Sequence, residues 1–365
     1  MKNSAFPVLA LLLSLGCTSH EEQVPGQAGW MAIPNAYAKH FQLQLRDSDR
    51  RLLVFGNDVN KDTIGIYRWT STATGKEVAV EFPMKRVALV STTHLPFFEA
   101  LQATDVVVGL AHADQVRDAR VRERVRTGGI QEITRADGLD RERLIALTPQ
   151  AVFDYPFGRG GQEQNLFHTT IAVTEYLEEH PLGRAEWIRF FGILLDRQEM
   201  ADSLFRAIVH RYEVARDMNQ HLGKAPHVLF GSQWEQRWWM PPGNSYMATL
   251  INDASGHYWF TDSIAEGNIE VPLEQVLDIG RECQFFGLIM AAQGKVDGSR
   301  SVGGDERLSA LDAVRKGGFI GNTARNDLFG KALLEPEVVL KDLRCIFHPG
   351  SCGDHQPSYF FPIDQ

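Results

Sequence analysis

One long helix between two stretches of alternating strands and helices constrains the fold most. Residues 196–221 contain neither Gly nor Pro, and apolar side chains such as Leu204, Ile208 and Tyr212 recur there at helical spacing. On either side, short apolar runs typical of buried strands alternate with helical segments. Such alternation predicts parallel sheets covered by helices. We therefore expect an α/β fold with two Rossmann-like lobes, each built on a mostly parallel central sheet, joined by the helix 196–221.

The lobes differ in what precedes their sheets. The N-terminal lobe, residues 35–195, begins with alternating apolar and polar positions up to Pro83, which predict antiparallel strands. The C-terminal lobe, residues 222–365, starts directly with a buried strand. The strands expected for the two parallel sheets are 86–90, 105–110, 151–155 and 171–173, then 227–231, 285–289 and 318–320, with the last one at a sheet edge.

The N-terminus has the features of an export signal. An apolar run from Ala5 to Leu15, too short to span a bilayer, is followed by Gly16 and Cys17. A small residue before a cysteine at this place resembles a bacterial lipobox, in which Cys17 is lipidated and residues 1–17 form the signal. Residues 18–34 would then be a flexible tether to a membrane. An ordinary cleaved signal or an N-terminal anchor is the alternative, and in each case the protein works in the periplasm or at the cell surface.

Charge and cysteine content limit the chemistry. The formal net charge of −9 argues against nucleic-acid binding, which requires a basic surface. Cys345 and Cys352 are close in sequence, with glycines around them, so a local disulfide is expected. A zinc site with His348 and His355 is the alternative, although zinc usually has more tightly paired ligand spacing. Cys283 is expected to be a buried thiol.

Several segments resemble one family of transport proteins. Arg86–His94 resembles the first strand and ligand-facing loop of the helix-linked (class III) periplasmic substrate-binding proteins of ABC importers. Asp140–Val152, Val271–Leu277 and Pro336–Leu343 resemble further segments of that family in the same order. The resemblance implies a monomer that carries a metal–organic chelate (an iron siderophore, haem or cobalamin) to an ABC permease dimer. It implies no catalysis and no cofactor beyond a metal carried inside the ligand.

The ligand is expected in the cleft between the lobes, at the carboxyl ends of the strands. His94 is a candidate axial ligand for iron or cobalt, or else a hydrogen-bonding part of the wall. The segment from Trp234 to Trp239 is expected to be a loop whose indole rings form a wall against a flat ligand, unless they fill the core. Arg159, Arg237 and Arg325 could pair with an anionic chelate. The complete set of candidates is Ser91, Thr92, Thr93, His94, Tyr155, Phe157, Arg159, Trp234, Arg237, Trp238, Trp239, Tyr246 and Arg325.

Two acidic residues match the family's permease-docking positions. Glu142 and Glu274 begin helical segments, one in each lobe, and the resemblance implies that they pair with permease arginines. An acid in the first turn of a helix is also favoured by the helix dipole, so simple stabilisation of the helix is the alternative. The sequence contains no GxSxG, HExxH or phosphate-binding glycine motif. A binding or sensing module without a transporter, and a chelate-processing enzyme, remain as alternatives.

Overall fold

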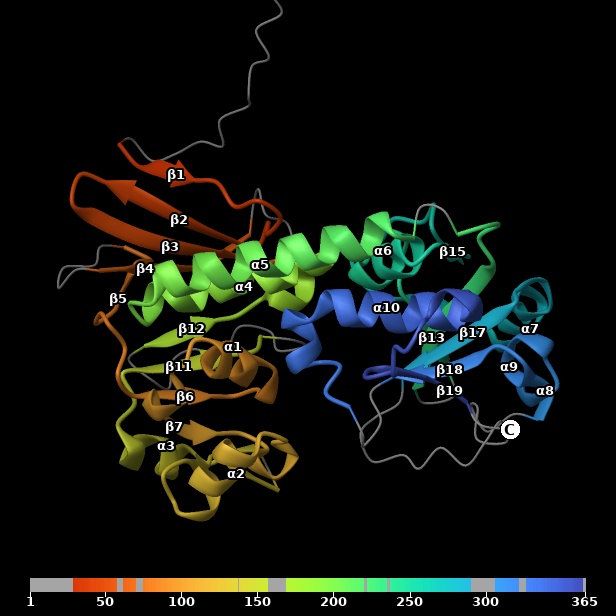
Figure 1. Cartoon of the computed structure of the whole chain (residues 1–365). Helices are drawn as coiled ribbons and strands as arrows, with labels where there is room; N and C mark the ends of the chain where they lie inside the picture. Colours follow the sequence, from red (N-terminus) through yellow and green to blue (C-terminus); the bar gives the residue numbers. More distant parts are fainter. Residues whose placement is uncertain are drawn as a thin grey trace, which may run out of the picture.

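The structure is a computed structural model that describes residues 29–57, 62–69, 75–136, 138–156, 169–219, 222–234, 237–289, 306–321 and 326–363. Two α/β lobes lie side by side, and α5 (Gln198–Asp217) runs between them (Figure 1). The expected two-lobe fold with one linking helix is confirmed. Cys17, Phe157, Arg159 and Arg325 lie outside the described residues. Among the described residues, no helix combines the length and the apolar character that a membrane crossing requires.

The N-terminal lobe is built on a five-stranded parallel sheet. Its strand order is β12 (Thr170–Ala172), β11 (Ala151–Asp154), β6 (Val87–Leu89), β7 (Val107–Leu110) and β8 (Gln131–Glu132). The residues of β6 are all buried, as expected for a strand covered on both faces. The helices of this lobe are α1 (Leu95–Ala100), α2 (Ala119–Arg126), α3 (Arg141–Leu147) and α4 (Pro181–Leu194).

The C-terminal lobe also has a parallel core, extended by antiparallel strands. The parallel strands are β15 (His257–Tyr258), β13 (His227–Trp234), β17 (Phe285–Ile289) and β18 (Gly318–Gly321). β14 (Arg237–Met240) and β16 (Ile269–Val271) pair antiparallel next to β13, and β19 (Phe360–Pro362) pairs antiparallel with β18. The prediction of β18 as an edge strand is therefore wrong, because the C-terminal tail returns and covers it. The helices are α6 (Tyr246–Asp253), α7 (Leu273–Glu282), α8 (Glu306–Ser309), α9 (Asp312–Arg315) and α10 (Pro336–Phe347).

The N-terminal strands form a separate antiparallel sheet that packs on α4, next to the linking helix α5. Its strands are β1 (Met31–Ile33), β2 (Phe41–Arg46), β3 (Asp49–Phe55), β4 (Thr63–Arg68) and β5 (Val78–Ala79), of which β5 pairs parallel to β4. Phe41 of this sheet contacts Trp187 of α4, with ring centroids 5.0 Å apart. The sheet therefore covers part of α4, which explains why nearly every residue of that helix is buried.

Two buried glutamates fix the segment before β2 to the N-terminal lobe. Glu186 accepts hydrogen bonds from the backbone N–H groups of residues 36–38, and Glu178 accepts them from residues 39 and 40. Glu178 also accepts a hydrogen bond of 2.9 Å from the indole N–H of Trp187. Tyr37, in the same segment, stacks on His180 and contacts Phe205 of α5. The N-terminal segment is therefore part of the packing around the linking helix.

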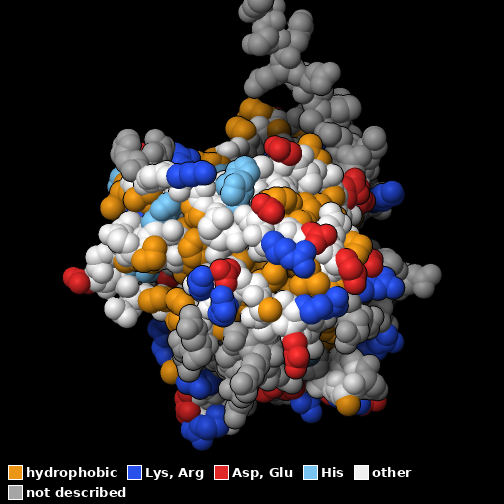
Figure 2. Space-filling model, turned by 90° about the vertical axis from the view of Figure 1, so that its right-hand side faces the viewer, with side chains coloured by type: hydrophobic (Ala, Val, Ile, Leu, Met, Phe, Trp, Pro, Cys, Tyr) orange, Lys and Arg blue, Asp and Glu red, His pale blue; other side chains and the backbone are white. Residues whose placement is uncertain are grey.

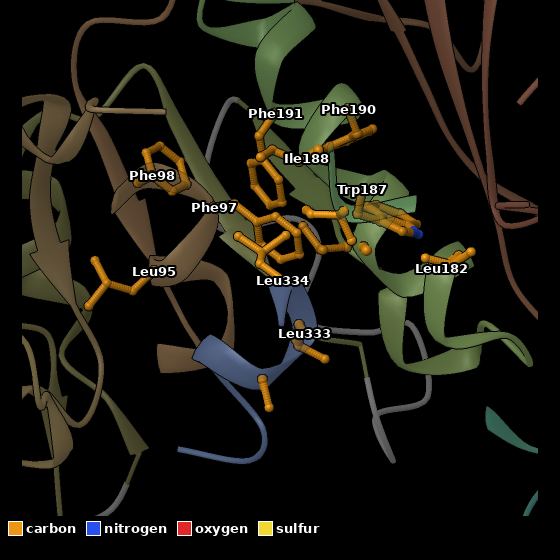
Figure 3. Close-up of a cluster of buried hydrophobic side chains, with 14 of the residues drawn as sticks. Leu95, Phe97, Phe98, Leu182, Trp187, Ile188, Phe190, Phe191, Leu333 and Leu334 are labelled. Atoms are coloured by element: carbon orange, nitrogen blue, oxygen red, sulfur yellow. The ribbon is translucent and has the colours of Figure 1, made fainter. Parts of the chain in front are cut away.

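The apolar core continues from one lobe into the other. Leu334, which precedes α10 in the C-terminal lobe, lies beside Phe97 of α1, and Leu333 belongs to the same buried cluster as Phe97 and Phe191 of α4 (Figure 3). Phe97 and Phe191 themselves stack, with ring centroids 4.8 Å apart. Burial of such side chains contributes roughly 1.5–3 kcal/mol each. The seam between the lobes is therefore a packed contact on this side.

Candidate functional site

Polar and aromatic side chains from both lobes meet where the strands of the N-terminal sheet end. We call this set the interlobe cluster: Thr93, His94, Tyr155, Glu175, Tyr176, Arg184 and Tyr246. Thr93 and His94 follow β6, Tyr155 follows β11, and Glu175 follows β12. The loops at the carboxyl ends of parallel strands meet at one edge of a sheet, which is where ligands bind in open α/β folds. Arg184 comes from α4, and Tyr246 comes from the start of α6 in the other lobe.

The hydroxyl groups of the loop after β6 form a chain of hydrogen bonds that ends at Glu175. The Ser91 hydroxyl accepts a hydrogen bond of 3.2 Å from the backbone N–H of Thr93, which begins the 3₁₀ turn Thr92–His94. The two hydroxyl oxygens of Ser91 and Thr93 lie 2.8 Å apart. Thr93 in turn donates to Oε1 of Glu175, at 3.3 Å. This loop is therefore ordered by its own hydroxyl groups, and it positions one carboxylate oxygen.

Glu175 is the acid of the interlobe cluster, and one of its carboxylate oxygens lacks a hydrogen-bond partner among the described residues. Glu175 is 2% exposed, and the oxygen without a partner in the described part of the chain is Oε2. Burial raises the pKa of Glu175 to about 7, and the nearby charge of Arg184 acts in the opposite direction. Because a buried polar atom without a partner costs free energy, this carboxyl group is a candidate ligand contact.

His94 lies beneath the surface of the site. It is fully buried, and neither ring nitrogen has a hydrogen-bond partner within the described part of the chain. Its ring lies near those of Tyr155 and Phe191, at centroid distances of 6.4 Å and 6.3 Å. Burial lowers the pKa of His94 to about 3, so the imidazole is neutral at physiological pH. The described residues contain no cluster of three or more His, Cys, Asp or Glu side chains that could hold a metal ion.

Three tyrosines and an arginine complete the interlobe cluster. The rings of Tyr155 and Tyr176 are 4.5 Å apart, and burial raises the pKa of both phenols, that of Tyr176 to about 12. The Arg184 guanidinium lies over the Tyr246 ring at 3.5 Å and donates to the backbone carbonyl of Tyr176 at 2.7 Å. Arg184 and Tyr246 also line a cavity of about 20 Å³, which has room for about one water molecule.

The tryptophan segment is a β-hairpin, which differs from the predicted loop. Side chains alternate between faces along β14, so Trp238 points into the core of the C-terminal lobe and is fully buried against Phe286. The prediction that Trp238 faces the ligand is therefore wrong. Trp239 is half-buried, whereas Trp234 is 66% exposed. Arg237 is exposed and forms an ion pair of 3.2 Å with Glu270 of β16.

The two predicted docking acids are exposed in the first turns of their helices. The side chain of Glu142 in α3 is 88% exposed and lies 3.5 Å from Arg135. Glu274 in α7 is 77% exposed, 4.0 Å from Arg307, and it lines a groove of about 730 Å³ between α7, α8 and α9. Figure 2 shows the side of the C-terminal lobe on which these helices lie, where charges of both signs are interspersed with apolar patches.

The C-terminal cysteines are not joined in the structure. Cys345, Cys352 and Cys283 are all free cysteines, so the expected disulfide is absent here. Burial and the neighbouring Cys352 thiol raise the pKa of Cys345 to about 12. The other side chains considered for zinc are engaged elsewhere, since His348 contacts the Ser255 carbonyl at 3.1 Å and His355 contacts Asp342 at 2.6 Å. Cys283 is buried, as expected.

The structure brings together five of the predicted ligand residues and adds three that were not predicted. Ser91, Thr93, His94, Tyr155 and Tyr246 lie in or next to the interlobe cluster, and Thr92 is half-buried in the same turn. Glu175, Tyr176 and Arg184 were missed. A signal was available for Glu175 and Tyr176, because they follow the strand predicted at 171–173 and the rule on strand ends applies to them as well.

Comparison with known proteins identifies the family. A model described as "Periplasmic binding protein" matches residues 87–324, which is more than half of the chain. An uncharacterized lipoprotein of Methanocaldococcus jannaschii is 23% identical over 317 residues, which cover 82% of this chain and 74% of the relative.

Two solved structures show the same fold at low sequence identity. A periplasmic heme-binding protein of Pseudomonas aeruginosa aligns with a TM-score of 0.59 at 16% identity, over 77% of this chain and 99% of the other. An ABC-type Fe³⁺-hydroxamate transport system protein of Saccharomonospora viridis aligns with a TM-score of 0.54 at 19% identity, over 72% and 93%. With its two lobes, its linking helix and its match over residues 87–324, the chain belongs to the periplasmic binding protein family.

Proposed function

We propose that the protein is a lipid-anchored solute-binding subunit that captures a metal–organic chelate and delivers it to an ABC permease dimer. Members of this family bind small molecules for ABC transporters and are not enzymes. The interlobe cluster is the observation on which the proposal depends, because it joins groups from both lobes at the carboxyl ends of the strands. A ligand held there contacts both lobes, as delivery by a two-lobed carrier requires.

The chemistry of the cluster supports a chelate with an organic shell. Burial raises the pKa of the Tyr155 and Tyr176 phenols, so in the ligand-free protein they offer hydrogen-bond donors and aromatic faces to an organic shell. Heme and Fe³⁺-hydroxamate appear in the descriptions of two structures with this fold. An iron siderophore, haem or cobalamin is therefore the class of ligand that we propose.

Binding can be tested on the purified protein with known chelates. Native mass spectrometry of protein purified from its own host should show a bound small molecule that contains iron or cobalt. Titration with ferrioxamine B, haemin, ferric citrate and cyanocobalamin, followed by tryptophan fluorescence, should show saturable binding of at least one of them. Tyr155→Ala should weaken that binding, whereas Lys316→Ala, on the outer side of the C-terminal lobe, should not. The absence of any binding, or turnover of the chelate, would contradict the proposal.

The lipid anchor is a separate part of the proposal. It is supported by the lipobox-like Gly16–Cys17 sequence and by the lipoprotein relative. Cys17→Ser should move the protein from the membrane fraction to the soluble fraction and abolish labelling by a fatty-acid analogue. Unchanged labelling of this variant would show that Cys17 is not the modified residue.

A further inference from the structure

The buried carboxyl group of Glu175 gives the interlobe cluster a preference in charge. We propose that Glu175 receives a protonated amine of the ligand's organic shell, so that the site selects chelates that carry an ammonium group. The inference deepens the proposed function and rests on it. The two carboxylate oxygens of Glu175 differ in their hydrogen bonding, since Oε1 has a side-chain donor and Oε2 has no donor among the described residues.

One carboxylate oxygen of Glu175 is hydrogen-bonded, and the other is buried without a hydrogen-bond partner among the described residues. Oε1 accepts a hydrogen bond of 3.3 Å from the neutral hydroxyl of Thr93, and the backbone N–H groups of residues 175 and 176 also stabilise the carboxylate. Oε2 is buried and has no partner within the described part of the chain. Burying this acid costs free energy, because Oε2 has lost its contact with water and has gained no donor from the described residues in return. A donor that arrives with the ligand would complete its hydrogen bonding.

The described groups around Glu175 neither donate a hydrogen bond to Oε2 nor place a cation against it. His94 and the phenols of Tyr155 and Tyr176 are neutral. Arg184 is the cation of the cluster, but its guanidinium donates hydrogen bonds to the backbone carbonyls of Tyr176 and Glu178, and its plane lies over Tyr246. Among the described residues no ion pair joins Arg184 to Glu175. The charge of Arg184 therefore acts on Glu175 from a distance and leaves the buried Oε2 without a hydrogen-bond partner in the described part of the chain.

An ammonium group satisfies this arrangement better than a neutral or anionic group. A charge-assisted hydrogen bond to a carboxylate is roughly twice as strong as a neutral one. The neighbouring rings of Tyr155 and Tyr176 add faces that attract a cation. A ligand carboxylate at the same place would face the like charge of Glu175. The preferred ligand is therefore a chelate with a protonated amine near its surface.

Cation binding should also be linked to pH. The pKa of Glu175 is raised to about 7 by burial, so the carboxyl is only partly ionised near neutrality. An ammonium group binds the ionised form, which means that binding releases a proton from Glu175. Affinity for the cationic ligand should therefore rise from pH 6 to pH 8, by up to about tenfold per pH unit below the pKa.

A matched pair of iron chelates tests the proposal. Ferrioxamine B carries a terminal ammonium, and N-acetylferrioxamine B has the same iron centre without that charge. Isothermal titration of the full chain should give about tenfold tighter binding of the ammonium form. In Glu175→Gln the two dissociation constants should agree within about twofold. Glu123→Gln, an exposed acid paired with Arg126 on α2, is the control and should keep the preference of the unmodified protein.

The possible outcomes separate the inference from the proposed function. Equal or tighter binding of the acetylated form, or an unchanged preference in Glu175→Gln, overturns the inference. Binding of haemin, ferric citrate or cyanocobalamin without binding of ferrioxamine B also overturns it, but leaves the proposed function standing. If no chelate binds, both fail. Should Glu175→Gln not fold, as judged by thermal melting, Glu175→Asp keeps the charge and is expected to keep a reduced preference; loss of all preference in that variant counts against the inference.

Discussion

The Arg184 guanidinium lies 3.5 Å above the ring of Tyr246, and the two residues belong to different lobes. This contact joins the start of α4 to the start of α6 beside the interlobe cluster. A partly desolvated cation–π contact contributes about 0.5–2 kcal/mol. The pair therefore couples the relative position of the lobes to the shape of the ligand site.

The coupling between Arg184 and Tyr246 can be measured directly. Tyr246→Leu, Arg184→Met and the double variant form a double-mutant cycle on the free energy of urea unfolding. We expect a coupling energy of about 0.5–2 kcal/mol. Tyr246→Phe keeps the aromatic face and should behave like the unmodified protein. Additive effects of the two single changes would show that the contact does not stabilise the folded protein.

Two tryptophans of one hairpin should respond differently to removal. Trp238→Ala leaves a cavity in the core of the C-terminal lobe and should lower the free energy of unfolding by about 3–5 kcal/mol. Trp234→Ala removes a ring that is 66% exposed and should change that free energy by less than about 0.5 kcal/mol. Urea unfolding of the two variants checks the contrast. Similar losses in both variants would contradict the placement of these side chains.

His94 should make the protein sensitive to acid. Burial lowers its pKa from 6.5 to about 3, so the folded state resists protonation that the unfolded state accepts. The contribution of His94 to the free energy of unfolding does not depend on pH above pH 6.5. As the pH falls from 6.5 to about 3, protonation of His94 in the unfolded state lowers the free energy of unfolding by about 1.4 kcal/mol per pH unit. His94→Leu should show a flatter dependence of unfolding free energy on pH over this range. An equally steep dependence in the variant would rule out His94 as the cause.

Charge reversal at the predicted docking acids should separate capture from delivery. Glu142→Lys with Glu274→Lys should leave chelate affinity unchanged, because neither residue belongs to the interlobe cluster. The double variant should lose uptake in cells, since an acid that faces a permease arginine becomes a like charge. Glu123→Lys is a control on another exposed helix. Retained uptake, or a parallel fall in affinity, would contradict the docking role.

The cysteine pair can be tested by counting thiols. Cys345 and Cys352 are close enough for their thiols to influence each other, although both are free in the structure. In protein isolated from an oxidising compartment without reductant, we expect that a maleimide reagent leaves both unlabelled and that reduction restores labelling. Cys283→Ser removes the remaining core thiol and simplifies the count. Full labelling before reduction would show that the pair stays reduced.

The alternation of strands and helices was enough to predict the two lobes, because burial on both faces leaves a continuous apolar run in each central strand. The place of β18 was not predictable, since β19 reaches it from a tail with no strong strand pattern. The three tryptophans show the same limit at the site. The three tryptophans are close in the sequence, which predicts a loop there. The segment instead forms a β-hairpin, and because side chains alternate between the two faces of a strand, Trp238 points into the core. The position of Glu175 directly after the strand predicted at 171–173 could have been recognised, but the burial that leaves Oε2 without a partner among the described residues depends on tertiary packing, which no local sequence pattern reveals.

The hydrogen bonds from residues 36–40 to Glu178 and Glu186 determine the smallest chain that could fold on its own. The match to the family begins at residue 87, after the whole N-terminal sheet. A chain that started there would leave two nearly fully buried carboxylates without their backbone donors, and it would uncover Trp187. Each unpaired buried acid costs at least about 1–3 kcal/mol, a large share of the stability of a protein of this kind. We therefore expect that a stably folded protein needs residues 36–40 in addition to the region that the family model matches.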